Sequence, residues 1–274
     1  MSSSPSHVAA KAPYIGTVYY RQRSILLLAP TLVIEPEDKT YRRQSIRLIL
    51  GLKKPMELAF SDGARFTTQA MLVSADSGLC DMQGNEAQVA LMDVTPATPE
   101  YAALAPFLGA DKRRQLPIQD FENLAPRLID GQSQPLSCED VEGIMQNLVF
   151  IMTGNRPVPL SMDHRIVLAL KLIETLPLTA INLATLSDAV NLSTDRFRHL
   201  FKDITGCTVS QYARQTAVWR ALEYIENGYN ITGAAHAVGF HDVSHLYRVY
   251  SEMFGVSLSE KNNPRKFRRV RCFN

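Results

Sequence analysis

Short apolar runs separated by turn residues fill the first third of the chain. Six runs of strand length lie between Ser24 and Met92, at positions 24–28, 31–35, 45–50, 56–60, 70–75 and 87–92. Proline, glycine and the triplet Ser61-Asp62-Gly63 separate them. Several short β-favouring segments at close spacing, with no long helix between them, are typical of a sandwich or a small barrel. The pattern therefore predicts a β domain.

After Pro99 the apolar positions recur at helical spacing. The stretch VEGIMQNLVFIM carries one apolar stripe, formed by Val141, Ile144, Met145, Leu148, Val149 and Met152. Two interpretations remain open for this helix: it packs onto the β domain, or its stripe pairs with a second chain. TGNRPVP follows at 153–159 and is interpreted as an interdomain linker, because glycine and two prolines interrupt helices.

From Asp163 onward the pattern is helical, and it repeats. A shift of 48 positions pairs Leu183 with Ile231 and Asn191 with Gly239, and after one inserted residue, His241, a shift of 49 pairs Phe197 with Leu246. Each copy reads as a short helix, a tight turn and a second helix closed by glycine. Asn191 and Gly239 tolerate the left-handed backbone that a sharp helix end requires. The repeat predicts two helix-turn-helix units.

The segment between the copies, at 210–226, predicts one further helix. Its apolar stripe contains Tyr212, Val218 or Trp219, Leu222 and Ile225. A helix of this length spans about 26 Å. Two recognition helices that enter successive major grooves on one face of DNA must stand about 34 Å apart. A rigid connector of this size is compatible with that requirement.

The distribution of charged residues, and not the net charge, supports a division into an N-terminal and a C-terminal part. The net charge is +2. Acidic residues outnumber basic ones 17 to 15 in residues 1–159, whereas basic residues outnumber acidic ones 14 to 10 in 160–274. The densest basic run is the tail at 265–271, for which a polyanionic partner and simple solvation are both open.

Four cysteines, Cys80, Cys138, Cys207 and Cys272, lie far apart and form no CxxC pair. This spacing argues against a disulfide framework and against a structural zinc site, and fits a reducing cytoplasm. The N-terminus lacks an apolar core of signal-peptide length, and no run approaches a membrane span. We expect a cytoplasmic protein without a membrane partner.

The region from about Asp163 to Phe267 resembles the DNA-binding domain of the AraC/XylS family of bacterial transcription regulators. The matching motifs are LSTDRFRHLFKDITG at 192–206, YARQTAVWRALEYI at 212–225 and AVGFHDVSHLYRVYSEMFGVSLSE at 237–260. Ala217, Ser251 and Leu258 depart from the arginine, lysine and proline that are usual there. The resemblance implies a seven-helix-like domain that binds double-stranded DNA.

The helical periodicity separates core positions from exposed ones in both recognition helices. Phe197, Leu200, Phe201 and Ile204 form the core face of the first helix. The residues predicted to contact DNA are Thr194, Arg196, Arg198, His199, Lys202, Val243, Ser244, His245, Tyr247 and Arg248, with Ser251 on the same exposed side. The first residues of a recognition helix meet base edges, so Thr194, Arg196 and Arg198 are the candidates for bases and Lys202 for phosphate.

Histidines 236, 241 and 245 suggest a metal site at first sight. No cysteine or carboxylate pair stands at ligand spacing beside them, so zinc binding is not expected. A place at the start of the second recognition helix explains His241 and His245 instead. No metal and no cofactor are predicted.

The family resemblance implies a cupin-like β-barrel that binds an effector and dimerises at the N-terminus. The only histidine before position 164 is His7, so the metal site of cupin enzymes is missing, and Cys80 and Cys138 cannot supply a cysteine-rich one. No GxSxG motif, phosphate-binding glycine loop or nucleophile-base pair is present. Catalysis is not expected, although an enzyme on the β domain that is localised to DNA remains the rival class.

Three arginines stand out in this domain, Arg42, Arg43 and Arg47, in the segment KTYRRQSIRLIL. Arg43 and Arg47 form RxxxR, which is similar to the first half of the cyclic di-GMP motif of PilZ domains, whereas the second half is absent. Arginine forks bind phosphates and guanine edges. A basic edge that faces solvent or an acidic neighbour is the competing interpretation, and a sugar or another metabolite in the barrel is a further alternative.

These observations predict an α+β protein of two domains. Residues 1–13 form a flexible N-terminus, 14–152 an effector-binding and dimerisation domain built on a β-barrel or sandwich with flanking helices, 153–159 a linker, and 160–274 an all-α DNA-binding domain with two helix-turn-helix units. The expected function is a homodimeric transcription regulator controlled by a small-molecule effector, with cyclic di-GMP as the leading candidate. The sign of regulation does not follow from the sequence.

Overall fold

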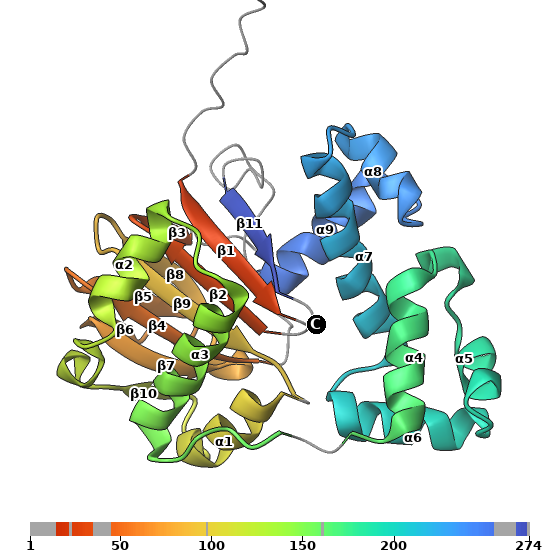
Figure 1. Cartoon of the computed structure of the whole chain (residues 1–274), viewed down its shortest axis with the longest axis horizontal. Helices are drawn as coiled ribbons and strands as arrows, with labels where there is room; N and C mark the ends of the chain where they lie inside the picture. Colours follow the sequence, from red (N-terminus) through yellow and green to blue (C-terminus); the bar gives the residue numbers. More distant parts are fainter. Residues whose placement is uncertain are drawn as a thin grey trace, which may run out of the picture.

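The computed structural model describes residues 15–21, 24–34, 45–96, 98–159, 162–254 and 267–272. Figure 1 shows a β-rich N-terminal domain beside a helical C-terminal domain. The two-domain α+β architecture predicted from the sequence is confirmed.

Two sheets face each other in the N-terminal domain. Within the described residues, the larger one has seven strands in the order β10-β7-β4-β9-β2-β1-β11, with β11 parallel to β1 and its other pairs antiparallel. The smaller one has four strands in the order β3-β8-β5-β6, all antiparallel. The strands are β1 (Gly16–Arg21), β2 (Ser24–Ala29), β3 (Leu32–Ile34), β4 (Ile46–Gly51), β5 (Met56–Phe60), β6 (Arg65–Thr68), β7 (Ala70–Ser74), β8 (Leu79–Gly84), β9 (Val89–Val94), β10 (Arg113–Gln115) and β11 (Phe267–Arg271).

Both faces of the larger sheet are buried, because strand residues alternate between two cores. On β4, Leu48 packs with the helices on one face while Ile49 packs with the smaller sheet on the other. The interior between the sheets is filled by Phe60 and by the fully buried Met56, Met71 and Met82. Of the sandwich and the small barrel that the sequence predicted, the structure is the sandwich. Side chains fill the space between its two sheets.

Three helices cover the other face of the larger sheet, as Figure 1 shows. They are α1 (Pro99–Leu108), α2 (Ala125–Ser133) and α3 (Cys138–Thr153), accompanied by the 3-10 turn η2 (Ile118–Phe121). A second 3-10 turn, η1 (Ala75–Ser77), connects β7 to β8. The predicted stripe of α3 lies in this core, with Ile144 and Leu148 each 1% exposed. Of the two interpretations left open, packing onto the β domain is correct. The stripe is not free to pair with a second chain, because its own sheet covers it.

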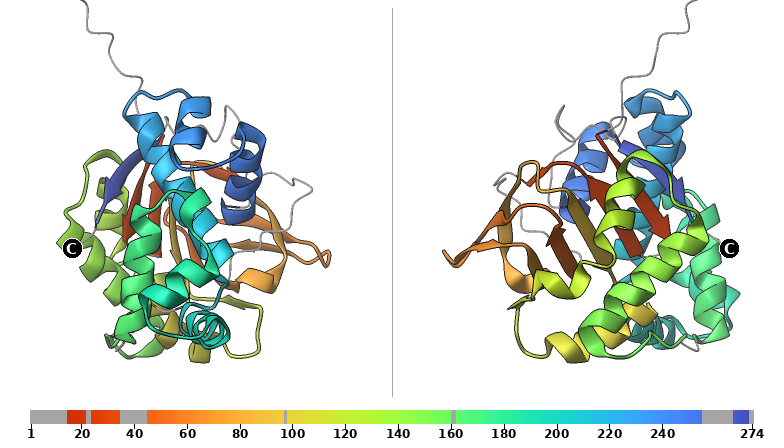
Figure 2. Two further views of the ribbon diagram at one scale, coloured as in Figure 1. Left: turned by 90° about the vertical axis from the view of Figure 1, so that its right-hand side faces the viewer. Right: turned by 60° about the vertical axis from the view of Figure 1, so that its left-hand side comes forward.

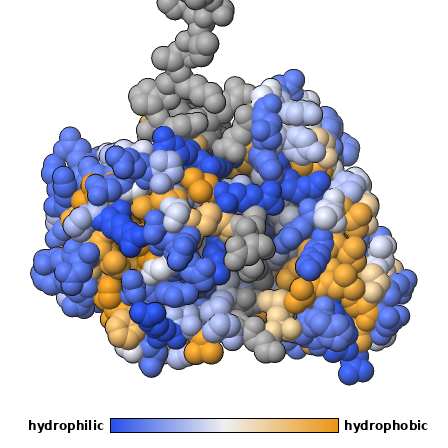
Figure 3. All heavy atoms as spheres, viewed as in Figure 1, coloured by the Kyte–Doolittle hydropathy of each residue, from blue (hydrophilic) through white to orange (hydrophobic). Residues whose placement is uncertain are grey.

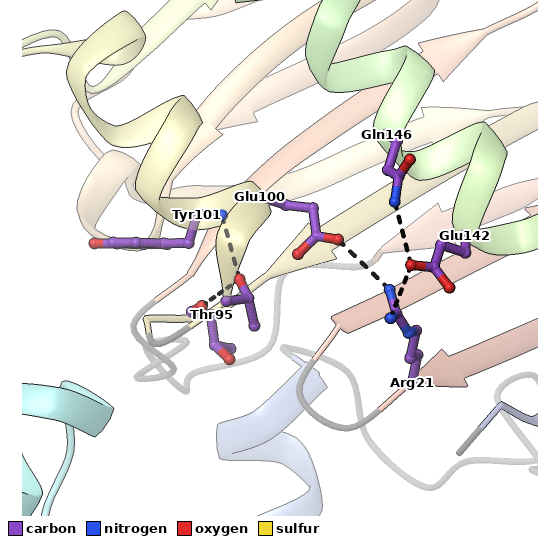
Figure 4. A network of polar contacts seen from close by, with 7 residues as sticks. Arg21, Thr95, Glu100, Tyr101, Glu142 and Gln146 are labelled. Carbon is purple, nitrogen blue, oxygen red and sulfur yellow. Dashed lines mark hydrogen bonds and ion pairs between the residues drawn. The ribbon is translucent and has the colours of Figure 1, made fainter. Parts of the chain in front are cut away.

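A polar network fixes the end of β1 to two of these helices (Figure 4). Arg21 lies 3.9 Å from the carboxylate of Glu100 on α1 and 3.0 Å from that of Glu142 on α3, and Gln146 donates a hydrogen bond to Glu142. Glu100 is buried, so desolvation raises the pKa of its carboxyl. A hydrogen bond from its own backbone amide and the charge of Arg21 oppose that rise, and Glu142 adds to it. Arg21 is thus the positive charge that, together with the backbone hydrogen bond, stabilises the buried carboxylate.

We expect Arg21→Ala to destabilise the chain by about 1–3 kcal/mol at neutral pH, because Glu100 would remain buried without its cation. The pKa of Glu100 would rise further above its unfolded value, so the folded state would hold an extra proton above the pH at which the unfolded chain releases it. The destabilisation should therefore be small near pH 4.5, grow as pH rises through the folded pKa, and appear in urea unfolding curves measured at pH 5 and 7. Arg21→Lys is the matched control, and an equal loss at both pH values would contradict the assignment to Glu100.

The helical domain repeats its architecture as the sequence predicted. It contains α4 (His164–Thr175), η3 (Leu178–Ala180), α5 (Leu183–Ala189), α6 (Thr194–Thr205), α7 (Val209–Glu226), α8 (Ile231–Ala237) and α9 (Val243–Phe254). Helices α5 and α8 are related by the 48-residue shift at both ends, and α6 and α9 by the 49-residue shift. The two helix-turn-helix units are confirmed.

Two expectations from the sequence are wrong. Residues 267–271 of the basic tail are not a free solvated run, because they form β11 at the edge of the N-terminal sheet. Cys138 and Cys272 form a disulfide with their Cα atoms 5.2 Å apart, although their spacing argued against one. Both errors have one cause, since the strand brings together segments that are distant in sequence. Consequently the range 160–274, predicted as the DNA-binding domain, ends in a strand of the other domain's sheet.

Candidate nucleic-acid interface

The turn between α5 and α6 is built as its residue types require. Asn191 adopts a φ of 52°, and the amide of Leu192 donates to the carbonyl of Ser187. Ser193 caps α6 by accepting a hydrogen bond from the amide of Arg196. Gly206, at φ 69°, ends the helix. These local constraints fix the angle at which α6 leaves the domain.

Helix α6 turns one face inward and the other to solvent. Phe197 and Phe201 are fully buried, and Leu200 and Ile204 are half-buried against the same cluster. The predicted DNA contacts on this helix all lie on the exposed face, at Thr194, Arg196, Arg198, His199 and Lys202. The helix therefore presents a polar, mainly basic surface.

An acidic neighbour, which the sequence argument overlooked, modifies that surface. The guanidinium of Arg198 lies 3.0 Å from the carboxylate of Asp195, one turn earlier on the helix. Both side chains are exposed, so the pair is weak, but it partly neutralises Arg198 before DNA arrives. The i, i+3 spacing of the two residues could have revealed it.

The second unit repeats the turn with glycine. Gly239 adopts a φ of 92°, and the ring of Phe240 is buried in the angle between the helices. Asp242 caps α9 by accepting a hydrogen bond of 2.7 Å from the amide of His245, and its carboxylate also lies 3.1 Å from the ring of His241. The glycine adopts the left-handed backbone as predicted, and the buried Phe240 and the Asp242 cap complete the turn.

On α9 the predicted contact residues differ in exposure. Ser244, Tyr247 and Arg248 are exposed, whereas Val243 and His245 are half-buried. The His245 ring packs edge-on against Phe240 at 5.1 Å, and burial, with help from Arg248 and Arg214, lowers its pKa. The lowered pKa favours the neutral imidazole, which offers a hydrogen bond and no charge. Ser251 is buried, so its expected place on the exposed side is wrong.

The three histidines do not converge on a metal site. His241 is held beside Asp242 and His245 beside Phe240, whereas His236 lies on α8. Within the part of the chain that the structure describes, no three potential ligand side chains cluster.

Helix α7 belongs to both units. Its first half, with Val209, Tyr212 and Ala213, packs in the core of α4, α5 and α6. Its second half, with Val218 and Leu222, packs in the core of α8 and α9. The left view of Figure 2 looks onto this helical domain, with the sheets behind it. A shared helix, about 27 Å long for its 18 residues, fixes the spacing of the two recognition helices.

Helix α4 adds an apolar surface that the sequence argument did not single out. Val167 and Leu168 are 36% and 44% exposed, and Figure 3 shows apolar surface in the region of α4 and α5.

The candidate effector arginines are only partly described. Arg42 and Arg43 lie outside the described residues. Arg47 faces Asp93 across the β4–β9 pair and donates two hydrogen bonds to its Oδ2, at 3.1 and 2.9 Å. Asp93 is 1% exposed and also accepts a hydrogen bond from Ser45. For Arg47 the geometry favours the acidic neighbour over a ligand.

The comparison with known families decides the nature of the helical domain. Residues 186–263 match a family model described as a helix-turn-helix domain, and the match spans both units. These residues form an AraC-type helix-turn-helix domain. The resemblance inferred from the sequence motifs is therefore confirmed, and no curated protein sequence matches the chain.

The combination of this helical domain with a β-rich N-terminal domain is also found in solved structures. The apo form of a ToxT variant from Vibrio cholerae shares 11% identity and a TM-score of 0.53, covering 86% of this chain and 96% of that one. Another ToxT structure from Vibrio cholerae shares 10% identity and a TM-score of 0.50 over the same fractions. At such identity the likeness establishes the two-domain fold. None of the described helices combines the length and apolar content that crossing a bilayer requires.

Proposed function

We propose that the protein is a sequence-specific transcription regulator that binds double-stranded DNA through α6 and α9 and receives a small-molecule signal through its N-terminal domain. The observation that carries the proposal is the pair of AraC-type helix-turn-helix units, each with an exposed polar face and joined by the rigid α7. Such a protein acts where the chromosome is, which for a bacterial regulator is the cytoplasm.

The roles of the exposed residues follow from their places on α6. Arg196 lies in the first turn of α6, where recognition helices meet base edges, and its fork suits the O6 and N7 of guanine. Lys202 lies six residues further along, where contacts with phosphate are more frequent. Arg198 would have to leave Asp195 in order to bind, so its net contribution is smaller than that of Arg196.

Arg196→Ala is expected to cost about 1–3 kcal/mol at a specific site and to relax the preference for one base. Arg198→Ala should cost less, and Asp195→Ala, which frees Arg198, should strengthen binding. Lys202→Ala should weaken all sequences alike and reduce the salt slope by about 1. The full chain can be titrated by anisotropy against duplexes selected from a random pool. If Arg196→Ala keeps both the affinity and the base preference, α6 is not the recognition helix.

We propose that the N-terminal domain binds a small-molecule effector, whose identity the screen below is designed to find. The space between the sheets is filled, so a ligand there must displace side chains, and Met56, Met71 and Met82 are the ones that adapt most readily. Cyclic di-GMP depends on Arg42 and Arg43, while Arg47 is engaged with Asp93. A thermal-shift screen of nucleotide messengers, sugars and other metabolites tests this part. Loss of binding in Arg47→Ala alone would not count, because that change also removes an internal ion pair.

A homodimer on two half-sites also stays a proposal. The apolar stripe of α3 is buried against the sheet of its own chain, so dimer contacts would need another surface. Light scattering of the protein with and without DNA measures the assembly directly.

A further inference from the structure

Strand β11 joins the two domains. It pairs in parallel with β1, with Gly16 opposite Phe267 and Tyr20 opposite Arg271, and so forms the edge of the N-terminal sheet. Figure 1 shows it between that sheet and the helices α7 and α9. Because β11 follows the helical domain in the chain, its docking ties the end of that domain to the effector domain.

The arginines of β11 form polar contacts with both domains. Arg268 donates a hydrogen bond of 2.8 Å to the carbonyl of Ser133 on α2. Arg269 donates one of 2.8 Å to the carbonyl of Leu222 on α7, and Arg271 lies 3.1 Å from the carboxylate of Glu223 on the same helix. The basic run is therefore a set of interdomain contacts.

Aromatic stacking reinforces the junction. Tyr20 of β1 and Trp219 of α7 stack with ring centroids 4.8 Å apart and planes 11° from parallel. The packing is incomplete, because a cleft beside the stack is lined from both domains, with Glu174 and Thr216 on one side and Arg271 on the other. Interfaces between domains permit relative motion of the domains unless they are large and hydrophobic.

The anchor is the disulfide between Cys138 and Cys272. Cys272 follows β11 directly, is 4% exposed, and donates its amide hydrogen to the carbonyl of Tyr20. Cys138 begins α3 and is exposed. The bond closes a sequence separation of 134 residues, so without it the ends must find each other against a large loop entropy. The strand that pairs with β11 is itself held in place, because Arg21 ties β1 to α1 and α3.

We propose that Cys138–Cys272 is a redox-reversible site, cleaved by a dithiol protein reductant, whose state decides whether β11 holds the DNA-binding domain on the effector domain. The regulatory role of this disulfide rests on the proposed function. A transcription regulator works beside DNA in a reducing compartment, where disulfides are usually transient and redox-sensing. The strap itself, meaning β11 with Cys272, is independent of that function.

The chemistry balances as thiol-disulfide exchange. A thiolate of the reductant attacks the Sγ of the exposed Cys138, forming a mixed disulfide and releasing Cys272 as a thiolate that takes up a proton. The second thiol of the reductant then attacks the mixed disulfide and releases Cys138. Two electrons pass to the protein, which gains two thiols, and the dithiol becomes a disulfide. The position of Cys138 at a helix N-terminus favours its thiolate as leaving group. The bond re-forms by the reverse exchange, in which the thiolate of Cys138 attacks the disulfide of the oxidised dithiol protein and the two electrons return to that protein.

The chain carries its own reporter for the strap. Trp219 is the single tryptophan, and it lies in the interdomain stack. Emission from the full-length protein therefore reports on this junction, and trypsin cleavage after Arg268, Arg269 and Arg271 reports on docking of β11. Both are recorded for the oxidised protein and after treatment with dithiothreitol, and alkylation under denaturing conditions counts the free thiols.

Reduction should raise the alkylated cysteines from the two free ones, Cys80 and Cys207, to all four. It should also shift the Trp219 emission to the red and accelerate cleavage in β11 at least about tenfold, which corresponds to about 1.4 kcal/mol of lost protection. Cys138→Ser and Cys272→Ser should behave like the reduced protein with or without reductant, whereas Cys80→Ser should respond like the wild type.

The proposal is overturned if oxidised and reduced protein give the same emission and cleavage rates, or if Cys138→Ser keeps β11 as protected as in the oxidised protein. Binding of a random-sequence duplex is measured on the same samples. Failure to bind DNA in either redox state would remove the proposed function, while the response of Trp219 and β11 to reduction would still establish the redox site.

Discussion

A chain that carries both Ile144→Glu and Leu148→Glu is expected to lose its folded N-terminal domain. Each residue is 1% exposed in the core under α3, so each change removes about 1.5–3 kcal/mol of apolar burial and places a carboxylate where no partner awaits it. Together the losses reach roughly 10 kcal/mol, comparable with the whole stability of a typical domain. Far-ultraviolet circular dichroism and near-ultraviolet spectra of the purified variant measure the loss.

The same helix provides the control. Phe150 is 47% exposed on the outer side of α3, so Phe150→Glu should change stability by less than about 1 kcal/mol. Folded, soluble monomers from the double variant would show that the stripe serves as a surface between chains, as one interpretation of the sequence allowed.

The second large effect is expected at the turn of the second helix-turn-helix unit. Gly239 has a φ of 92°, and a Cβ added there would lie 2.8 Å from the backbone nitrogen of Leu178 and 3.1 Å from that of Thr179. Those atoms are held in place, since the amide of Leu178 donates to the carbonyl of Val238. Gly239→Ala must therefore combine left-handed strain with a backbone collision, and we expect a loss of about 3 kcal/mol or more.

Asn191 occupies the equivalent turn position in the first unit and separates these two causes. Its φ is 52° and it already carries a Cβ, so Asn191→Ala should cost about 1 kcal/mol from the backbone conformation alone. Urea unfolding followed by Trp219 fluorescence, together with DNA titration, compares the variants. Similar losses at the two positions would mean that contact with Leu178 contributes nothing.

The helical domain could be predicted closely because its signals are local. Caps, plugs and glycine stops at 191–193, 206 and 239–242 each depend on neighbours within a few residues, and the internal repeat checks one copy against the other. The exposed side of α6 follows from periodicity in the same way. Ion pairs such as Arg198–Asp195 are within reach of the same argument once helical spacing is examined.

The errors concern contacts between distant segments. Residues 267–271 look like a solvated basic run, because five residues with three arginines carry little apolar signal. What makes them a strand is β1, whose pairing no periodicity can reveal, and with β11 comes the Cys138–Cys272 bond. The partner of Arg47 escaped prediction for the same reason, since Asp93 is its neighbour only through the register of β4 and β9.

Strand β11 also constrains how the protein is made. On the ribosome β1 is synthesised early, but its parallel partner emerges only after α4 to α9. Throughout that interval one side of β1 presents unpaired backbone amides and carbonyls, a template for adding a strand from another nascent chain. Parallel pairing across so many residues is slow, because the loop must close before any contact repays its entropy. The last step of folding is therefore expected to be the docking of β11, and a chain delayed before that step would be the species most prone to aggregate.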